Sequence, residues 1–179
     1  IMNKENNSDT TEKLGQILEG IFDCSVTNVK GATDLLQKNG FKKGEVIVPS
    51  SGKRSKIGIY IFEAKTVLDT GFDDYWRLRQ VSNKVPKLNT GEERSKEILY
   101  VGKSTSKGVI SRINQHYKKI TQDVSTYALK LEDKNLCKYQ IKCHYYEFTQ
   151  DDKKYCNAIV AIFEQLLHDK LQPRVGSPR

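Results

Sequence analysis

The sequence predicts an α/β chain of the α+β type, because strand-like and helix-like segments follow one another from residue 57 to the C-terminus. Residues 57–62 carry isoleucine at every second position, the period of a strand with one apolar face. Residues 97–103, "EILYVGK", form a second apolar strand that ends in a Gly-Lys pair, and residues 108–120 have helical spacing. A third strand over 137–148 and a long helix over 151–171 complete the order strand, strand, helix, strand, helix.

The N-terminal third differs in character and predicts a helical extension. Apolar residues between 14 and 22 recur at helical spacing, and a second helical piece covers 33–40. A short strand over 45–49 then precedes "SSGKRSK", a small, flexible and basic stretch at 50–56 that suits a linker. We therefore expect an N-terminal helical extension with a basic linker over 1–56 and the main domain over 57–179. Within that domain, residues 66–96 look like an irregular insertion between the first two strands.

Composition narrows the class of partner. The 179 residues suffice for one ordinary core, and 30 Lys and Arg against 22 Asp and Glu give a net charge of +8, which favours a polyanion. The sequence lacks an apolar run approaching the ~18 residues of a membrane span, and the first residues are polar. The 4 cysteines form neither a C-x-x-C pair nor a zinc spacing. We expect an intracellular protein with no membrane partner and with reduced thiols.

Chemistry-bearing residues cluster in two places. The stretch 98–117 brings together Lys103, Lys107, Arg112 and His116 with no acid between them, and the last two share a helical face. Glu164 is a lone carboxylate in an apolar helical stretch, "AIVAIFEQLL". Uncompensated positive charge beside a buried strand, with one isolated carboxylate elsewhere, is typical of a site for phosphate chemistry.

Two tripeptides carry a resemblance to a known family. Gly58-Ile59-Tyr60 and Tyr100-Val101-Gly102 look like the paired signature of the GIY-YIG nuclease superfamily, and Arg112, His116 and Glu164 follow in the family's order. The resemblance covers residues 57–176, and histidine at 116 within this pattern is most similar to the type II restriction endonuclease branch. It implies a small domain with a mainly antiparallel three-stranded sheet flanked by helices. The gap between the tripeptides is longer than is usual for the family, and residues 66–96 fill it.

The resemblance implies a metal-dependent DNA endonuclease, in a cytoplasmic and bacterial setting, that uses Mg²⁺ or Mn²⁺ on duplex DNA. Tyr60 is the expected general base, because cationic neighbours lower the pKa of a phenol. Tyr100 supports it, and His116 is expected to accept its proton. Arg112 suits the scissile phosphate and Glu164 the metal ion. Cleavage of both strands by a chain with one site favours a homodimer or two sequential visits.

Residues outside the catalytic set are expected to contact DNA. The insertion mixes aromatic and basic side chains suited to stacking or base contact, and lysines flank the central helix. The expected contacts are Trp76, Arg77, Arg79, Lys103, Lys107, Lys118 and Lys119. An equally weighted interpretation is that Trp76 merely packs the insertion onto the core.

Other interpretations remain open from the sequence. Tyr60 and Tyr100 also suit ordinary strand positions, Arg112 and His116 a solvated helix face, and Glu164 an ion pair with a lysine at the edge of the core. A structure-specific repair or mobile-element nuclease would share the same chemistry. A non-catalytic nucleic-acid-binding module of the same fold is the third alternative. It is suggested by Gly176, with Ser177 beside it, where the family usually has an asparagine.

Overall fold

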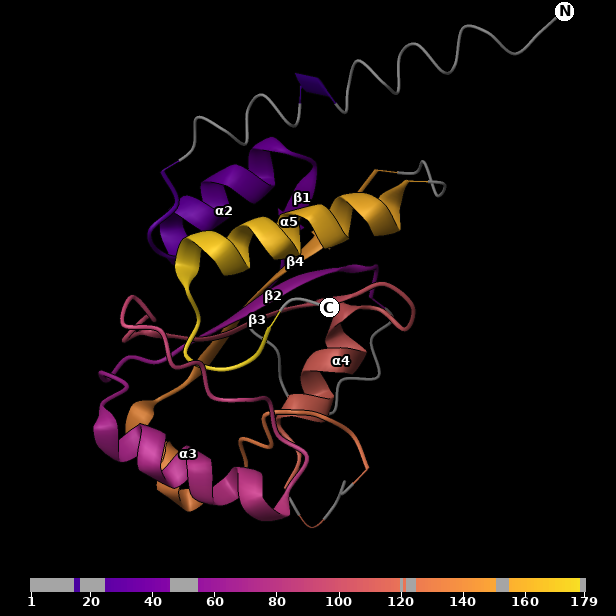
Figure 1. Cartoon of the computed structure of the whole chain (residues 1–179). Coiled ribbons are helices and arrows are strands. Elements are labelled where there is room, and N and C mark those ends of the chain that lie inside the picture. Colours follow the sequence, from indigo (N-terminus) through magenta and orange to yellow (C-terminus); the bar gives the residue numbers. More distant parts are fainter. Residues whose placement is uncertain are drawn as a thin grey trace, which may run out of the picture.

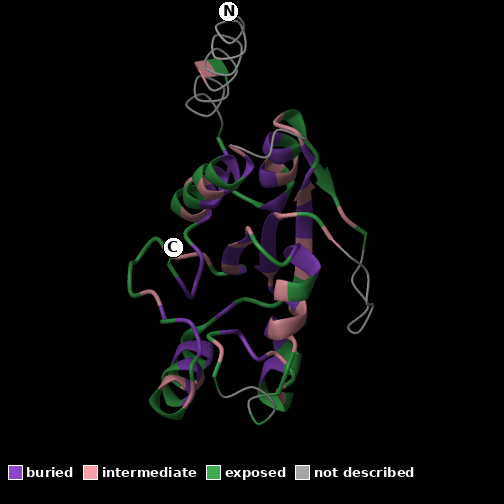
Figure 2. Ribbon diagram, turned by 90° about the vertical axis from the view of Figure 1, so that its right-hand side faces the viewer, coloured by how far each residue is buried: buried purple, intermediate pink, exposed green. Residues whose placement is uncertain are grey.

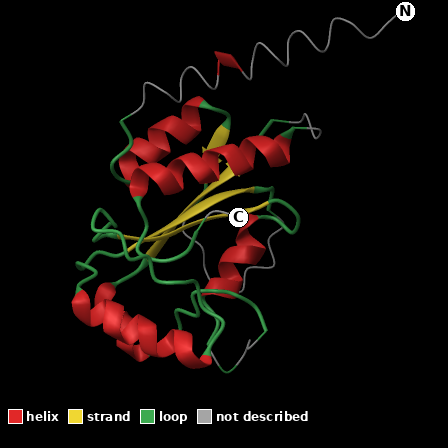
Figure 3. Ribbon diagram, viewed as in Figure 1, coloured by secondary structure: helices red, strands yellow, loops and turns green. Residues whose placement is uncertain are grey.

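The computed structural model describes residues 15–16, 25–45, 55–119, 121, 125–150 and 155–177. In this part the chain forms an α+β fold built on a 4-stranded antiparallel sheet, in the order β1-β4-β2-β3, with helices on both faces (Figures 1 and 3). The strands are β1 (Phe41–Lys43), β2 (Gly58–Glu63), β3 (Ile98–Ser104) and β4 (Lys142–Phe148). The helix expected over 14–22, apart from residues 15–16, and the strand expected over 45–49, apart from Glu45, lie outside the described residues.

Two helices cover each face of the sheet. On one face, α2 (Val29–Lys38) and α5 (Cys156–Leu171) pack together with the isoleucines of β2. On the other face lie α3 (Thr70–Ser82) and α4 (Val109–His116), beneath the sheet in Figure 1. A 3₁₀ helix, η1 (Lys134–Tyr139), precedes β4, so the third predicted strand begins later than its sequence pattern suggested. The described part of the chain contains no helix long and apolar enough to cross a membrane.

Strand β2 is central, and its alternation divides the core into two layers (Figure 2). It pairs antiparallel with β3 on one side and with β4 on the other. Ile59 and Ile61 belong to the cluster with α2 and α5, whereas Tyr60 and Phe62 belong to the cluster with α3 and α4. The pleat of the strand determines the face on which each side chain lies, because successive residues point to opposite faces. The period-2 prediction for this strand is therefore confirmed.

The described N-terminal residues contribute to this same sheet. Strand β1 pairs with β4 and places Phe41 opposite Phe148. The Phe41 ring also packs edge-on against the ring of Phe163 on α5, with the two centroids 5.3 Å apart. The sheet therefore has one strand more than the three expected. The sequence concealed it because "FKK" is too short to show alternation, and because strand pairing is a long-range property.

Residues 66–96 were expected to be an irregular insertion, but they contain the 13-residue helix α3. Asp69 caps this helix by accepting a hydrogen bond from the amide of Phe72 at 2.9 Å. The apolar pattern was hard to see because two of its buried positions are polar, Asp73 and Arg79. The cap, an aspartate three residues before phenylalanine, was the available signal.

A buried ionic network joins the insertion to the C-terminal tail, residues 172–177. The Arg174 guanidinium donates to both carboxylate oxygens of Asp73 at 2.8 Å, and Arg94 also donates to that carboxylate at 2.6 Å. The tail then runs beside the outer strand, where the amides of Arg174 and Val175 donate to Ile98 and Leu99. The insertion and the C-terminal tail are therefore joined by the ion pairs of Asp73.

Candidate active site

Four of the predicted catalytic residues come together between β2, β3 and α4. The Tyr60 hydroxyl oxygen lies 3.0 Å from Nε2 of His116, and both side chains are almost completely buried. The Tyr60 and Tyr100 rings stack with centroids 6.1 Å apart, and the Tyr100 ring lies 5.3 Å from that of His116. Arg112 lies one helical turn before His116, near enough to the Tyr60 hydroxyl for its charge to influence the pKa of that phenol.

The glycine of the second tripeptide makes room for this cluster. Gly102 is the cross-strand partner of Tyr60, and a Cβ atom built on it would lie 2.6 Å from both the Tyr60 hydroxyl oxygen and the Tyr100 ring. Such a contact is too short for any side chain, so the phenol can lie across β3 only where the strand has a glycine. The pairing of the two tripeptides in sequence therefore has a steric cause in the structure.

Replacing Gly102 with alanine should displace Tyr60 and destabilise the protein by about 1–3 kcal/mol, the usual cost of overpacking a filled core. The matched control is Gly91→Ala, because a Cβ at Gly91 meets nothing within 4 Å. Chemical denaturation of both variants measures the difference. Equal stability of the two variants would show that the site tolerates a methyl group and that the glycine is not needed to seat the phenol.

Burial governs the protonation of the cluster. It raises the pKa of Tyr60 well above the ordinary value, with the neighbouring Tyr100 adding to the rise and Arg112 opposing it. Burial, assisted by the Arg112 charge, lowers the pKa of His116 well below the ordinary value. Both groups are therefore neutral at pH 7. The expectation that cationic neighbours lower the pKa of Tyr60 is wrong for this structure, because desolvation outweighs the effect of Arg112.

Glu164 lies on α5, and its side chain forms an ion pair with Lys103 of β3. The carboxylate is only 5% exposed, and the pair is on the face of the sheet opposite Tyr60, because Lys103 and Gly102 are successive residues of one strand. This matches the ion-pair alternative for Glu164. It also means that Lys103, expected to contact DNA, is engaged with a carboxylate.

Among the predicted site residues, Glu164 is the one carboxylate that could hold a divalent ion of the magnesium type. No group of three or more histidine, cysteine, aspartate or glutamate side chains suited to a metal occurs in the described ranges. One carboxylate is nevertheless enough where water and phosphate complete the shell, as is usual for Mg²⁺. Glu164, on α5, and Arg112, on α4, belong to helices on opposite faces of the sheet, and the Glu164 carboxylate is paired with Lys103. Binding would require the Lys103 ammonium to move aside.

A polar cleft of about 350 Å³ adjoins the cluster. Tyr100 and Arg112 form one wall of this cleft, and the insertion and the tail form the others. The remaining lining residues, which the sequence did not single out apart from Gly176 and Ser177, are Gln80, Asn83, Val85, Pro86, Lys87, Tyr127, Gly176 and Ser177. Residues 80–87 therefore contribute to the site although they were expected to belong to an irregular loop.

Gly176, the position at which the resemblance led us to look for an asparagine, has no room for a side chain. Its φ is +89°, and a Cβ would lie 2.4 Å from the Tyr100 ring. Its carbonyl accepts hydrogen bonds from Asn89 Nδ2 at 2.8 Å and lies 3.1 Å from Nε2 of His168. The position therefore contributes its backbone to the rim of the cleft.

Two of the expected DNA contacts are buried. Trp76 is inaccessible to solvent and its indole donates to the carbonyl of Pro86 at 2.8 Å, so its packing role is the one the structure shows. Arg79 is 3% exposed and donates to the carbonyls of Leu129 and Lys130. Neither side chain can reach a duplex without local unfolding. Both contacts were expected because an aromatic and basic mixture was placed in an irregular insertion, whereas both residues lie on helix α3 and belong to its buried face.

The other expected contacts lie at the surface. Arg77 pairs with Asp74 through exposed side chains, and Lys119 pairs with Glu132 in the same way. Lys107 and Lys118 are exposed as well. These positions are compatible with contact to a polyanion.

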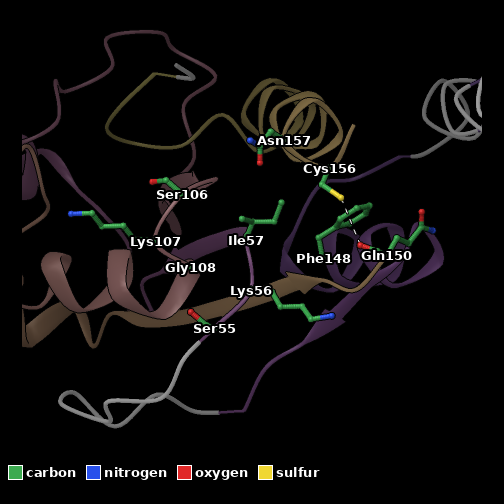
Figure 4. Close-up of a pocket in the computed structure, with 10 residues that line it drawn as sticks. All are labelled: Ser55, Lys56, Ile57, Ser106, Lys107, Gly108, Phe148, Gln150, Cys156 and Asn157. Atoms are coloured by element: carbon green, nitrogen blue, oxygen red, sulfur yellow. Dashed lines mark hydrogen bonds between the residues drawn. The ribbon is translucent and has the colours of Figure 1, made fainter. Parts of the chain in front are cut away.

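A larger cavity, of about 600 Å³, lies at the other end of α4 (Figure 4). In Figure 4, Ser106 and Lys107, from the loop before α4, lie on one side of the cavity and direct their polar ends away from the first residues of α5 on the other side. The described residues that line this cavity include none of the five predicted catalytic residues. This cavity is therefore separate from the tyrosine cluster.

Comparisons of the chain with protein-family models, with curated proteins and with solved structures found no match.

Proposed function

We propose that this protein is a metal-dependent DNA endonuclease that hydrolyses phosphodiester bonds, and that it acts as a sequence-specific restriction-type enzyme. The single observation that carries the proposal is the cluster of Tyr60, Tyr100, Arg112 and His116 at the edge of a polar cleft. A buried phenol that is hydrogen-bonded to an imidazole, close to a guanidinium, is an unusual core arrangement, and it suits the handling of a water molecule and a phosphate.

Each residue has a distinct task in this proposal. Arg112, which lines the cleft, binds the scissile phosphate through its planar donors. The Tyr60 hydroxyl orients the attacking water, and the stacked Tyr100 ring holds the phenol in place. Glu164 holds Mg²⁺ or Mn²⁺, which when bound supplies charge neutralisation at the phosphate.

Exposed cations supply the affinity for DNA. The net charge of +8 favours a polyanion, and Lys107, Lys118 and Arg77 are exposed for contact with the backbone. Binding through such contacts weakens as salt is raised, because released counterions drive it. Duplex DNA and a homodimer are part of the proposal, since one site per chain cuts one strand at a time.

A cleavage assay on long duplex DNA tests the proposal, with Mg²⁺, Mn²⁺ or EDTA in parallel reactions. We expect discrete fragments that depend on metal, with the cleavage rate lowered at least 10²-fold in Glu164→Gln and in Arg112→Ala. The control is Arg77→Ala, because Arg77 is an exposed arginine whose pair with Asp74 contributes little to stability. Thermal unfolding of each variant separates loss of activity from loss of fold. Full activity in Glu164→Gln would remove the carboxylate from the mechanism.

The assay also discriminates the alternatives. Cleavage restricted to branched or nicked DNA would indicate a structure-specific repair or mobile-element nuclease. Salt-dependent binding with no cleavage would indicate a non-catalytic module, which the Lys103–Glu164 ion pair favours because it occupies the carboxylate. The first result differs from the main expectation in the DNA substrate that is cut. The second differs in that adding a metal ion produces no cleavage.

A further inference from the structure

The hydrogen bonds of His116 fix which of its nitrogens carries the proton. Nδ1 of this imidazole accepts a hydrogen bond from the backbone amide of Leu129 at 3.0 Å. A backbone amide can only donate, so Nδ1 carries no proton, and the single proton of the neutral ring is on Nε2. Nε2 lies 3.0 Å from the Tyr60 hydroxyl oxygen. The imidazole therefore donates to the phenol oxygen.

The charged form of His116 is excluded by the same contacts. An imidazolium would direct a second N–H from Nδ1 against the N–H of Leu129, which breaks one hydrogen bond and opposes two donors. The ring is also completely buried, and Tyr60, Tyr100 and Arg112 are the titratable or charged groups that surround it. None of these carries a negative charge at pH 7, so nothing near the ring stabilises an imidazolium.

A short strap holds the Leu129 amide in this position. Arg79, on α3, donates through Nη2 to the carbonyls of Leu129 at 3.0 Å and Lys130 at 2.7 Å. From the other side, the amide of Leu131 donates to the carbonyl of His116 at 2.8 Å. The strap, residues 129–131, thus connects the insertion helix to the end of α4. Lys130 has a φ of +55°, which a lysine adopts only when its surroundings hold it there.

Arg79 is itself held firmly. Its guanidinium lies over the Trp76 ring at 4.6 Å from the centroid, and its Nε is 3.4 Å from the Asp133 carboxylate. The side chain therefore has one orientation, in which Nη2 faces the two carbonyls. A guanidinium suits this geometry better than an ammonium, because one planar group donates to two carbonyls and also stacks on an aromatic ring.

We propose that Arg79 is a positioning residue, which holds the strap so that the Leu129 amide keeps His116 as a hydrogen-bond donor to Tyr60. The part of this that concerns catalysis rests on the proposed function, since it assigns His116 a role toward Tyr60, the residue proposed to orient the attacking water. The geometric part concerns only the tautomer and what maintains it.

The direction of the hydrogen bond reverses the role expected of His116. The ring cannot accept the Tyr60 proton, because Nε2 already carries a proton and the lone pair of Nδ1 is engaged by Leu129. Its contribution is to donate to the phenol oxygen, which fixes the orientation of the Tyr60 hydroxyl and favours any negative charge that develops on that oxygen. The nearby Arg112 charge acts on Tyr60 in the same sense.

Nitrogen-15 NMR of the histidines tests the tautomer without DNA or metal. The chain has 3 histidines, and His116→Gln identifies the signals of the one that matters. We expect His116 to show a protonated Nε2 and an unprotonated Nδ1 that do not change between pH 8 and pH 5.5. A protonated Nδ1, or conversion to imidazolium near pH 6.5, would overturn the inference.

Variants of Arg79 test the positioning role. In Arg79→Met we expect His116 to populate both tautomers and the cleavage kcat to fall about 10-fold or more with little change in KM, whereas Arg79→Lys restores part of both. The control is Arg77→Met, which removes an exposed arginine two residues away. Unaltered His116 signals in a folded Arg79→Met protein would overturn the role of Arg79. If that variant does not fold, Arg79→Lys provides the comparison.

The outcomes separate this inference from the proposed function. A protein with the expected tautomer that never cuts DNA would sustain the geometry and reject the nuclease. A protein that cuts DNA while His116 carries its proton on Nδ1 would reject the inference and leave the nuclease standing.

Discussion

Tyr60→Phe should reduce DNA cleavage by about 10²-fold while leaving the protein folded, because it removes only the hydroxyl that would orient the attacking water. The same change leaves Nε2 of His116 without its acceptor in a buried site. An unsatisfied buried donor costs about 1–3 kcal/mol, so the free energy of unfolding should fall by about that amount. Activity assays and urea denaturation on the same preparation measure the two effects.

A second buried tyrosine provides the control for this change. Tyr146 lies on the opposite face of the sheet, where its hydroxyl is 2.7 Å from the Thr33 hydroxyl. Tyr146→Phe therefore also removes the hydrogen bond of a buried tyrosine, here a partly buried bond, and should leave cleavage unchanged. Equal activity in the two variants would show that the Tyr60 hydroxyl has no chemical role.

Asp73→Asn should have the largest effect on stability. Removing one partner from a buried ionic network costs about 3–5 kcal/mol, because a charge is left in the interior without compensation. Asp73 is bound by Arg174 through two hydrogen bonds and by Arg94 through a third, and the Asp73 and Arg174 side chains are 3% and 6% exposed. Chemical denaturation measures the loss of stability.

The neighbouring aspartate is a matched control for this prediction. Asp74 pairs with Arg77, but the two side chains are 75% and 56% exposed. An exposed ion pair contributes about 0–1 kcal/mol, so Asp74→Asn should be almost neutral. Similar losses in both variants would mean that helix capping or solubility, and not the buried network, accounts for the effect.

The sequence predicts the elements whose side chains alternate or repeat in an apolar pattern. The isoleucines of β2 and the spacing of Arg112 and His116 on α4 both lead to the observed arrangement, because each depends only on local periodicity. Helix α3 and strand β1 were missed for the opposite reason. The buried face of α3 includes Asp73 and Arg79, whose partners are distant in the chain, and β1 has only 3 residues.

The candidate site also has one part that local sequence patterns predict and another part that they do not. The paired tripeptides and the helix spacing bring the tyrosines, Arg112 and His116 to one place. The amide that fixes the His116 tautomer comes from Leu129, 13 residues further on and outside any regular element. The partner of Glu164, Lys103, lies 61 residues earlier. Contacts of this kind depend on how the elements pack, which no local pattern reveals.

The C-terminal tail has a consequence for how copies of the chain meet one another. A bare outer strand can accept a strand from another molecule, which is a common route to self-association. Here the tail amides of Arg174 and Val175 occupy the carbonyls of Ile98 and Leu99, so the apolar half of β3 is already satisfied within its own chain. The other half carries Lys103, and a charge discourages edge-to-edge pairing. Where the tail does not cover the edge of β3, Lys103, the lysine that pairs with Glu164, therefore disfavours pairing with a strand of another molecule.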